Sequence, residues 1–395
     1  MRLLDRKIYA IAGGVCAPEK KVVYGIKISK TNPDPFASVS YTDDSVGFSP
    51  SYGNNGNFID NGWNSRFPFS KIRPCVLKNG KVSYYLNPND FSKTAGGYNA
   101  ILDGTDGDVM IEFPKIWYSF SQDANYYYIK YSNRPGDGFS DFAMRYKGSV
   151  REKFYIGAYL SSVLDGKLRC VSGLMPVYSK SISELRTLAQ ANGSGYELLS
   201  WNKLMLLQVL FAVRFKSIDG QTALGEGNSN SSNDFFSGAA NSKGMNYGSQ
   251  SAGEAVKFCG LEDFWGGFSL LIDGFALNAD GNGGISSCSV AVADGNFNNT
   301  ASGYTVAGEL GSAYSGYLSA IQATNQLGFL AAGASGSSST YFCDSTRAIC
   351  ALALRFPHYG GNLFSRKDCG PFHFRILSGA ADGGFYSGGR LMYCP

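Results

Sequence analysis

The chain has little charge and almost no histidine. Charged residues make up 17% of its 395 residues, and only two histidines occur, His358 and His373. A nucleophile activated by histidine must therefore use one of these two side chains. No G-x-S-x-G elbow or paired acid motif lies near either. The sequence therefore predicts no catalytic residue.

Three other features are missing. The net charge is only +4, and no Lys/Arg cluster is interleaved with aromatic residues, so nucleic acid is excluded as a partner. No stretch approaches the roughly 20 apolar residues that a membrane span needs. The start, MRLLDRKIYAIAGGVC, has too short and broken an apolar part for a lipoprotein signal. We expect a protein made in the cytoplasm that does not insert into membranes.

Metal-binding spacing is also missing. The nine cysteines are scattered without a C-x-x-C pair, which disfavours a zinc site. Their odd number favours reduced, buried thiols over a disulfide framework. The turns at Asp280–Gly283 and Asp294–Asn296 are rich in oxygen ligands, but their spacing is far from that of an EF-hand loop. We predict neither a cofactor nor a metal, with calcium at these turns as the alternative.

What the chain does have is glycine and tyrosine. It contains 50 Gly and 25 Tyr, and aromatic residues reach 14%. This composition favours a β-rich, loop-heavy protein whose surface uses Tyr, Asn and Ser. Antibody binding surfaces share these residue types, because Tyr supplies rigid contact area and Ser, Gly and Asn supply adaptable hydrogen bonding.

Strand signals dominate the first 148 residues. Alternation predicts a strand over residues 22–28, and Asn79-Gly80 predicts a type I′ hairpin over residues 76–85. Further strands are expected over 109–118, where Pro114 suggests an edge or a bulge, and over 126–131. The polar stretch 133–141 is typical of a seam between two parts of the chain.

Helix signals appear only after this seam. Ser181 and Glu184 form a capping box before a helix that Asn192-Gly193 closes. A second helix over about 201–215 is apolar all round, which predicts a central, buried position. No helix is expected beyond Phe215. The predicted fold class is α+β, with irregular backbone outweighing regular elements.

The segment 341–393 combines a regular frame with varied side chains. Apolar, glycine and other frame positions include Tyr341, Leu352, Leu354, Gly360, Gly361, Gly370, Pro371, Phe372, Arg390 and Leu391. The residues between them follow no helical or strand period. Such a pattern is typical of a binding surface carried on a rigid support, although an ordinary glycine-rich loop region is the alternative.

Several motifs carry a family resemblance. DGQTALGEG at 219–227, GLEDFWGGFSLLIDG at 260–274, GSSSTYFCD at 336–344 and the terminal YGGN, CGPF and GGRL resemble the C-type-lectin-like fold of the formylglycine-generating-enzyme type. They resemble more closely the variable ligand-binding proteins diversified by retroelements and phage tail receptor-binding proteins of the major tropism determinant kind. Trp265, Gly266, Asp273 and Gly274 agree with the family pattern, whereas the positions between Gly266 and Asp273 depart from it.

The resemblance implies an architecture. Residues 1–95 would be a β-rich region for attachment and trimerisation, 96–148 an intermediate β region, and 149–395 a C-type-lectin-like domain with two helices, a long loop-rich β region and a variable face at 341–393. It also implies that the varied residues of this face point outward as a ligand site. These residues are Ser345, Thr346, Arg347, Ile349, His358, Tyr359, Asn362, Phe364, Ser365, Arg366, Lys367, Asp368, His373, Arg375, Ser378, Asp382, Phe385 and Tyr386.

The function implied is adsorption without catalysis. By this resemblance the chain is a receptor-binding protein of a phage tail tip, a homotrimer in the virion. It would bind a protein or glycan on a bacterial surface from outside the cell and contact other tail proteins through its N-terminal region. Two alternatives stay open: a bacterial surface adhesin, and a formylglycine-generating-type copper oxidase using Cys343 and Cys350. The seven-residue separation of these cysteines is wider than the oxidase motif.

Overall fold

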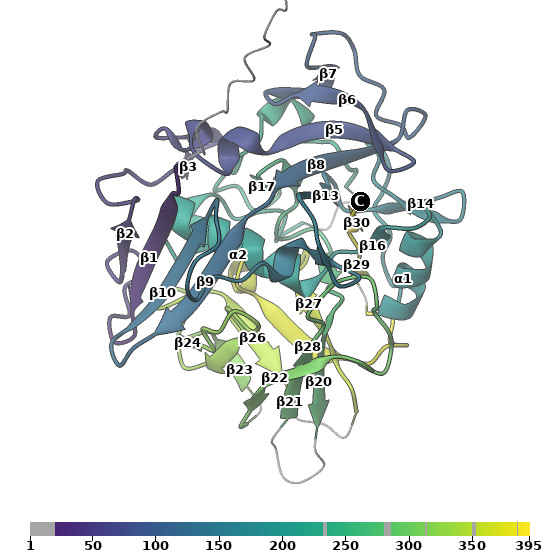
Figure 1. Cartoon of the computed structure of the whole chain (residues 1–395). Helices are drawn as coiled ribbons and strands as arrows, with labels where there is room; N and C mark the ends of the chain where they lie inside the picture. The colour runs from purple at the N-terminus through teal and green to yellow at the C-terminus, as the bar shows by residue number, and fades with distance from the viewer. Residues whose placement is uncertain (1–19, 232–234, 280–285, 313, 350–352, 385) are drawn as a thin grey trace, which may run out of the picture.

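A computed structural model describes residues 20–231, 235–279, 286–312, 314–349, 353–384 and 386–395 (Figure 1). Strands make up 37% of the chain and helices 12%, so the protein is predominantly β and the predicted α+β class with a two-helix lectin-like domain is wrong. Many of the strands are only two to five residues long. Segments of this length are too short to show a clear period in the sequence.

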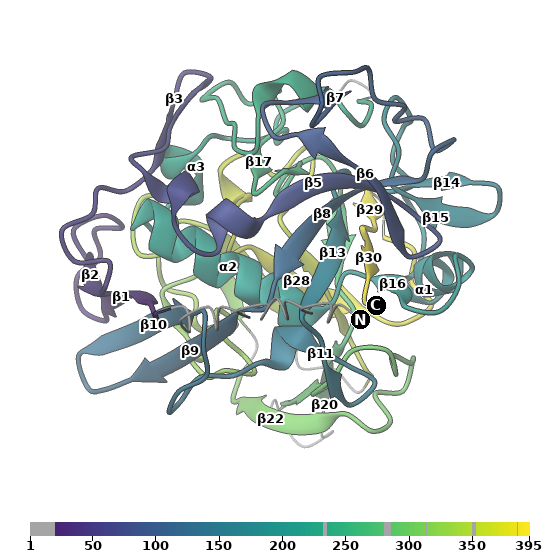
Figure 2. The same cartoon turned by 45° about the horizontal axis from the view of Figure 1, so that its top comes forward.

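The largest sheet has seven antiparallel strands and crosses the upper part of the molecule (Figures 1 and 2). In sheet order its strands are β16 (Tyr196–Leu198), β30 (Leu391–Tyr393), β13 (Lys153–Gly157), β8 (Asp108–Pro114), β5 (Arg73–Lys78), β6 (Lys81–Asn87) and β7 (Asp90–Thr94). The predicted segments 1–95, 96–148 and 149–395 all contribute strands to this sheet. The boundaries predicted at residues 95 and 148 therefore fall within one continuous sheet.

A four-stranded antiparallel sheet lies at one side of the molecule (Figure 1). Its order is β2 (Val39–Asp43), β1 (Val23–Ser29), β10 (Tyr126–Ser132) and β9 (Trp117–Gln122). The single strand predicted over 109–118 is divided between two sheets. Pro114 ends β8 because proline has no N–H to continue the ladder, and β9 begins after the break.

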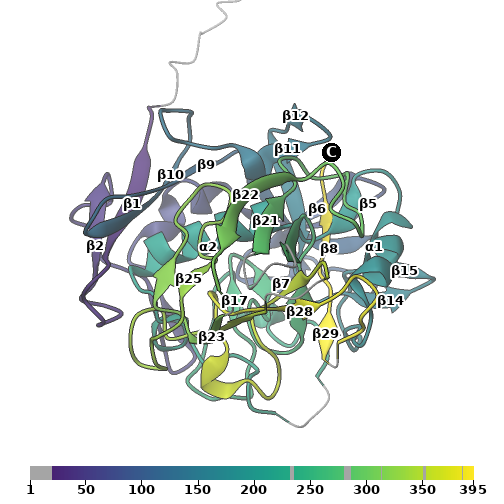
Figure 3. The same cartoon turned by 90° about the horizontal axis from the view of Figure 1, so that it is seen from below.

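The C-terminal half forms a six-stranded mixed sheet, which lies at the opposite end of the molecule from the seven-stranded sheet. Figure 3 shows the molecule from this end. Its order is β23 (Tyr314–Tyr317), β26 (Ser345–Ala348), β28 (Phe374–Ser378), β27 (Phe356–Tyr359), β19 (Ser269–Leu271) and β29 (Ser387–Gly388). A three-stranded sheet lies near it and consists of β20 (Phe275–Ala279), β21 (Ser286–Val290) and β22 (Thr305–Leu310).

Short hairpins complete the strands. The two-stranded pairs are β3 (Tyr52–Asn54) with β4 (Asn57–Ile59), β11 (Arg145–Tyr146) with β12 (Ser149–Val150), β14 (Ser162–Leu164) with β15 (Lys167–Arg169), β17 (Lys257–Phe258) with β18 (Leu261–Glu262), and β24 (Ala320–Ile321) with β25 (Ala331–Gly333).

The local sequence signals were read correctly where they are strong. β5 and β6 form the predicted hairpin, and Asn79 and Gly80 have φ angles of 51° and 73°, as a type I′ turn requires. Helix α1 (Ile182–Gln190) begins with the predicted capping box between Ser181 and Glu184. Both predictions are confirmed. The short helix α3 (Gly220–Ala223), capped by Asp219, was not expected.

Helix α2 (Trp201–Phe215) is the centre of the molecule (Figure 1). All of its residues are buried, which confirms the central position predicted from its apolar surface. Its polar side chains must then find partners inside the protein. Lys203 forms an ion pair with the buried Asp294, which also accepts a hydrogen bond from the Ser200 hydroxyl at 2.8 Å.

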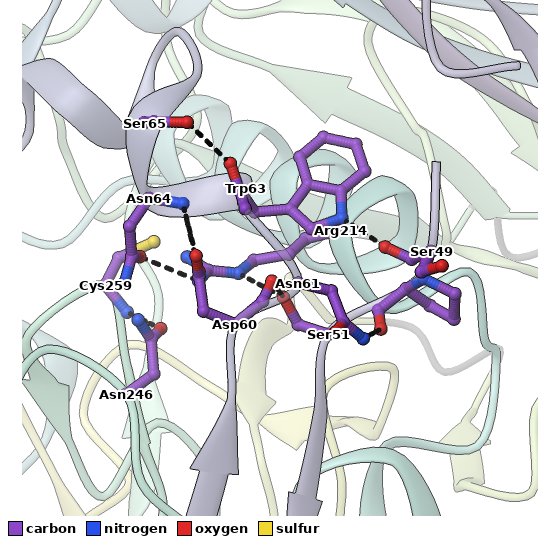
Figure 4. A network of polar contacts seen from close by, with 12 residues as sticks. Ser49, Ser51, Asp60, Asn61, Trp63, Asn64, Ser65, Arg214, Asn246 and Cys259 are labelled. Atoms are coloured by element: carbon purple, nitrogen blue, oxygen red, sulfur yellow. Dashed lines mark hydrogen bonds and ion pairs between the residues drawn. The ribbon is translucent and has the colours of Figure 1, made fainter. Parts of the chain in front are cut away.

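The last turn of α2 holds the N-terminal hairpin through Arg214. Its guanidinium donates to Asp60 at 2.6 Å, to Asn64 at 2.8 Å and to the Ser51 hydroxyl at 3.1 Å (Figure 4). Because Arg214 is buried, these partners compensate a charge that would otherwise be costly. Residues 51–64 are thereby fixed to the core.

The described cysteines are buried, as the sequence predicts. They are Cys75, Cys170, Cys259, Cys288, Cys343, Cys369 and Cys394. Cys16 and Cys350 lie outside the described residues.

The Lys203–Asp294 pair gives a stability prediction. Lys203→Met leaves a buried carboxylate without its cation, and we expect the free energy of unfolding to fall by about 3–5 kcal/mol. The matched control Lys180→Met removes a lysine from an exposed ion pair with Glu184. It should change the free energy of unfolding by less than about 1 kcal/mol. Urea denaturation measures both, and equal small effects would contradict the role given to Lys203.

Candidate ligand-binding face

The six-stranded sheet brings the predicted site residues together. β26 carries Ser345–Arg347, β28 carries Arg375 and Ser378, and β27 carries His358 and Tyr359. These three strands are neighbours, in the order β26, β28, β27. Arg366–Asp368 form a short 3-10 helix between β27 and β28. Segments separated by more than thirty residues therefore meet in one sheet.

Most of the predicted residues are accessible. Arg347, Phe364, Arg366, Lys367, Asp368, Arg375 and Asp382 are exposed, and Ser345, Ile349, Asn362, Ser365, Ser378 and Tyr386 are partly exposed. Phe385 lies outside the described residues. We call the exposed and partly exposed residues of this set the terminal face.

Four predicted residues point inward. Thr346, His358, Tyr359 and His373 are buried, which corrects the expectation that they contact a ligand directly. Tyr359 packs in an aromatic cluster, with its ring centroid 5.7 Å from that of Phe264. In β27 every residue is buried, because this strand lies between β28 and β19 in the interior of the sheet.

Both histidines are held inside by local hydrogen bonds. Nδ1 of His358 lies 2.9 Å from the Ser387 hydroxyl. Nδ1 of His373 lies 2.8 Å from the carbonyl oxygen of Asp368, to which it donates, and 3.1 Å from the Ser345 hydroxyl. Burial lowers the pKa of each ring to about 4, so both are neutral at pH 7. They shape the support of the face and add no charge to it.

Most of the frame of the segment is buried. Tyr341 and Leu354 are partly exposed, and Leu352 lies outside the described residues. A Cβ at Gly370 would lie 2.0 Å from Oδ1 of Asp344, whose other oxygen accepts a hydrogen bond from the Phe372 amide at 2.6 Å. Arg390 is buried and donates to the carbonyl oxygens of Gly157 and Glu262. Most of the described frame positions therefore pack inward, and most of the varied positions lie outward.

A shallow pocket of about 350 Å³ opens on this face. Its two cationic residues, Arg347 and Arg375, are paired in register on the parallel strands β26 and β28. Adjacent strands lie about 4.8 Å apart, so the two side chains leave the sheet side by side. Neither makes an ion pair with a carboxylate among the described residues.

The carboxylate of the pocket, Asp368, is held by a tyrosine. Tyr317 donates from its hydroxyl to Oδ1 of Asp368 at 2.6 Å, and burial together with this carboxylate raises the pKa of Tyr317 to about 12. Asp368 is therefore directed toward Tyr317. The sequence reasoning missed Tyr317 and Ser315, which lie on β23 before the predicted segment. Only the alternating polar and aromatic run at 314–317 could have signalled them.

Aromatic side chains form the other part of the face. Phe364 is 53% exposed and meets Tyr386 edge to face, with ring centroids 5.0 Å apart. Tyr386 in turn stacks near Phe268 at 6.0 Å. The terminal face thus carries aromatic as well as arginine side chains, the two residue types that are enriched in binding hot spots.

The geometry of the described residues does not support the calcium site or the copper oxidase that the sequence left as alternatives. Within the described ranges no group of three or more His, Cys, Asp or Glu residues is placed to hold a metal ion. Asp294, a residue of one calcium candidate, faces the ammonium of Lys203, and Asp280–Gly283 lie outside the described residues. Burial raises the pKa of the Cys343 thiol well above its ordinary value, and its proposed partner Cys350 is not described. Across the described part of the chain, no helix is both long and apolar enough to cross a bilayer.

The buried histidines predict a pH dependence of stability. Their pKa of about 4 in the folded protein lies below the ordinary 6.5, so the unfolded chain binds more protons between these values. Stability from this source is present above pH 6.5 and is lost as the pH falls toward 4, by up to about 3 kcal/mol per histidine. The double variant His358→Gln, His373→Gln should therefore lose less stability than the natural chain between pH 7 and pH 4.5.

Urea denaturation at the two pH values measures this difference. Carboxyls with raised pKa values, such as Glu197 at about 7, act in the opposite direction but are common to both proteins and cancel. An identical loss in both proteins would show that the histidines are not held neutral.

Comparison with known proteins gives no assignment. No protein-family model matches the chain, and no curated protein matches it.

Proposed function

We propose that this chain is a non-enzymatic receptor-binding protein that attaches to an anionic ligand on a bacterial surface through its terminal face. The observation that carries the proposal is the register pair Arg347 and Arg375, which are exposed at one pocket and form no ion pair with any carboxylate of the described residues. Two like charges on adjacent strands repel each other, and a bound anion relieves this repulsion. Guanidinium groups also match carboxylates and phosphates with two parallel hydrogen bonds.

The charge of the whole face supports the same ligand class. Arg347, Arg366, Lys367 and Arg375 are its exposed cations, against the exposed acids Asp368 and Asp382. Asp382 is in part compensated by Arg355, at 3.6 Å. The pocket also presents hydroxyl groups from serine and tyrosine, which can bind the hydroxyls of a sugar. An acidic glycan, with carboxylates and hydroxyls on one chain, fits this combination.

The separation of frame and face supports a role in recognition. Packing inward fixes the glycine and apolar positions, while the exposed residues have few partners in the chain and can change without disturbing the core. The motifs of this segment resemble those of phage tail receptor-binding proteins, and we extend the proposal to adsorption by a phage tail tip. Assembly as a homotrimer, attachment through the N-terminal region and a place in the virion stay predictions. Several copies would make weak single contacts effective.

The proposal predicts selective binding of an acidic polysaccharide. The protein should bind immobilised polygalacturonate and should not bind its fully methyl-esterified form, which keeps the sugar but loses the charge. The variant Arg347→Gln, Arg375→Gln should weaken binding by about tenfold or more, because two charge-assisted contacts are lost. Raising salt from 0.1 M to 1 M should also weaken it, since the Debye length falls from about 10 Å to about 3 Å.

A matched control removes two exposed cations elsewhere. Lys71→Gln, Lys81→Gln changes the net charge by the same amount on another part of the surface and should leave binding within about twofold. Equal losses in the two double variants would mean that net charge, and not the terminal face, governs binding. The phage assignment is tested separately by the genes beside the locus: tail genes support it, and their absence favours a bacterial adhesin.

A further inference from the structure

A second cavity lies away from the terminal face. It measures about 720 Å³, within the range of small-molecule pockets. Its walls come from the 3-10 helices after β4, from β5 and β6, and from the loop before β17. Figure 1 shows β5 and β6 at the top of the molecule and β26 and β28 toward the bottom, so the cavity and the terminal face are separate.

The walls of this cavity are largely apolar. Phe58, Phe69, Ile72, Leu86 and Met245 contribute rings and aliphatic side chains. Phe69, Ile72 and Leu86 belong to the hydrophobic core, and Met245 and Phe58 pack against it. The apolar surface is therefore fixed by the fold and does not depend on a loop closing over it.

The charged groups of the cavity are all cationic. Arg73, Arg214 and Lys243 line it, and none of the described lining residues is acidic. Two of the cations are oriented by carboxylates outside the lining: Arg73 by Glu112 at 2.5 Å and Arg214 by Asp60 at 2.6 Å (Figure 4). Lys243 is exposed and forms no ion pair with a described carboxylate, although its ammonium lies 4.8 Å from the Tyr247 ring centroid.

The three cations contribute in different ways. Arg214 lines the cavity but is almost completely buried and paired with Asp60, so it offers a ligand little contact. Arg73 is 51% exposed at its side chain and also donates to the Tyr85 hydroxyl at 2.7 Å. Lys243 is exposed and lines the cavity, so its ammonium is accessible to a ligand. An apolar cavity with cations and no acid on its walls favours a molecule with an apolar body and an anionic group.

We propose that this cavity is a binding site for a small amphipathic organic anion, with its apolar body between Phe58, Phe69, Leu86 and Met245 and its anionic group at Lys243. The site is independent of the receptor-binding face and does not rest on the function proposed for that face.

Two dyes with the same aromatic body test the proposal. The probe 1-anilinonaphthalene-8-sulfonate carries the anionic group, and N-phenyl-1-naphthylamine lacks it. Fluorescence titration should show saturable binding of the sulfonate at one site per chain. Lys243→Gln should weaken binding of the sulfonate by about two- to fivefold, because only a partly exposed charge contact is lost. Binding of the neutral dye should not change. Lys243→Arg should restore binding of the sulfonate.

Filling the cavity provides the test of location. Ala95 is exposed and lines this cavity. Ala95→Phe should weaken binding of the sulfonate by about tenfold, because the larger side chain occupies space in the cavity. The matched control is Ala239→Phe. Ala239 is also exposed, but it lines a neighbouring cavity that shares Lys243 with this one. This control should leave the affinity unchanged.

Three results would overturn the proposal. Retained affinity in a folded Ala95→Phe protein would exclude this cavity. Loss of affinity in Ala239→Phe alone would place the dye in the neighbouring cavity. Equal binding of both dyes, unaffected by Lys243→Gln, would show that no anionic group is recognised.

Discussion

The structure depends on a helix that has no exposed residue. A buried polar group without a hydrogen bond destabilises the fold, because removing it from water costs free energy that nothing compensates. Helix α2 meets most of this requirement with segments from the whole chain, although Oε1 of Gln208 has no hydrogen-bond partner among the described residues. Trp201 donates to the carbonyl oxygen of Gln326 at 2.7 Å, Asn202 to that of Ala291 at 2.8 Å, and Gln208 to that of Pro371 at 2.6 Å. Lys203 and Arg214 are matched by carboxylates. The loops that a β-rich chain leaves irregular are thus fixed by specific contacts to one rigid element.

Two hydrogen bonds connect helix α2 to the strands of the terminal face. Gln208 holds Pro371, and the next residue, Phe372, donates its amide to Asp344, which directly precedes β26. β26 and β28 then run parallel from this junction, which sets Arg347 opposite Arg375. The position of the arginine pair therefore follows from the buried helix and from a carboxylate that leaves space only for Gly370. Arg347 and Arg375 are exposed and form no ion pair with a described carboxylate, so the residues that we propose for recognition differ from those that hold the sheet in place.

The sequence signals that succeeded are local, and those that failed are not. A capping box at Ser181, an Asn79-Gly80 turn and an all-apolar helix each act within a few residues, and each was placed correctly. The fold class was wrong because strands such as β29, of two residues, exist only through pairing with β19, more than a hundred positions earlier. The inward position of His358 likewise depends on the neighbours of β27 in the sheet, and the contribution of Tyr317 depends on the pairing of β23 with β26. The local sequence does not show which strands pair.

Two features decide how the terminal face responds to its surroundings. The histidines beneath it are buried and neutral at pH 7, with pKa values of about 4, and they add no charge to it. Ionic strength, by contrast, acts directly on exposed charges such as Arg347 and Arg375. Under the function that we propose, binding by this face responds to salt, and acidification acts on the face through the stability of the buried histidines that support it.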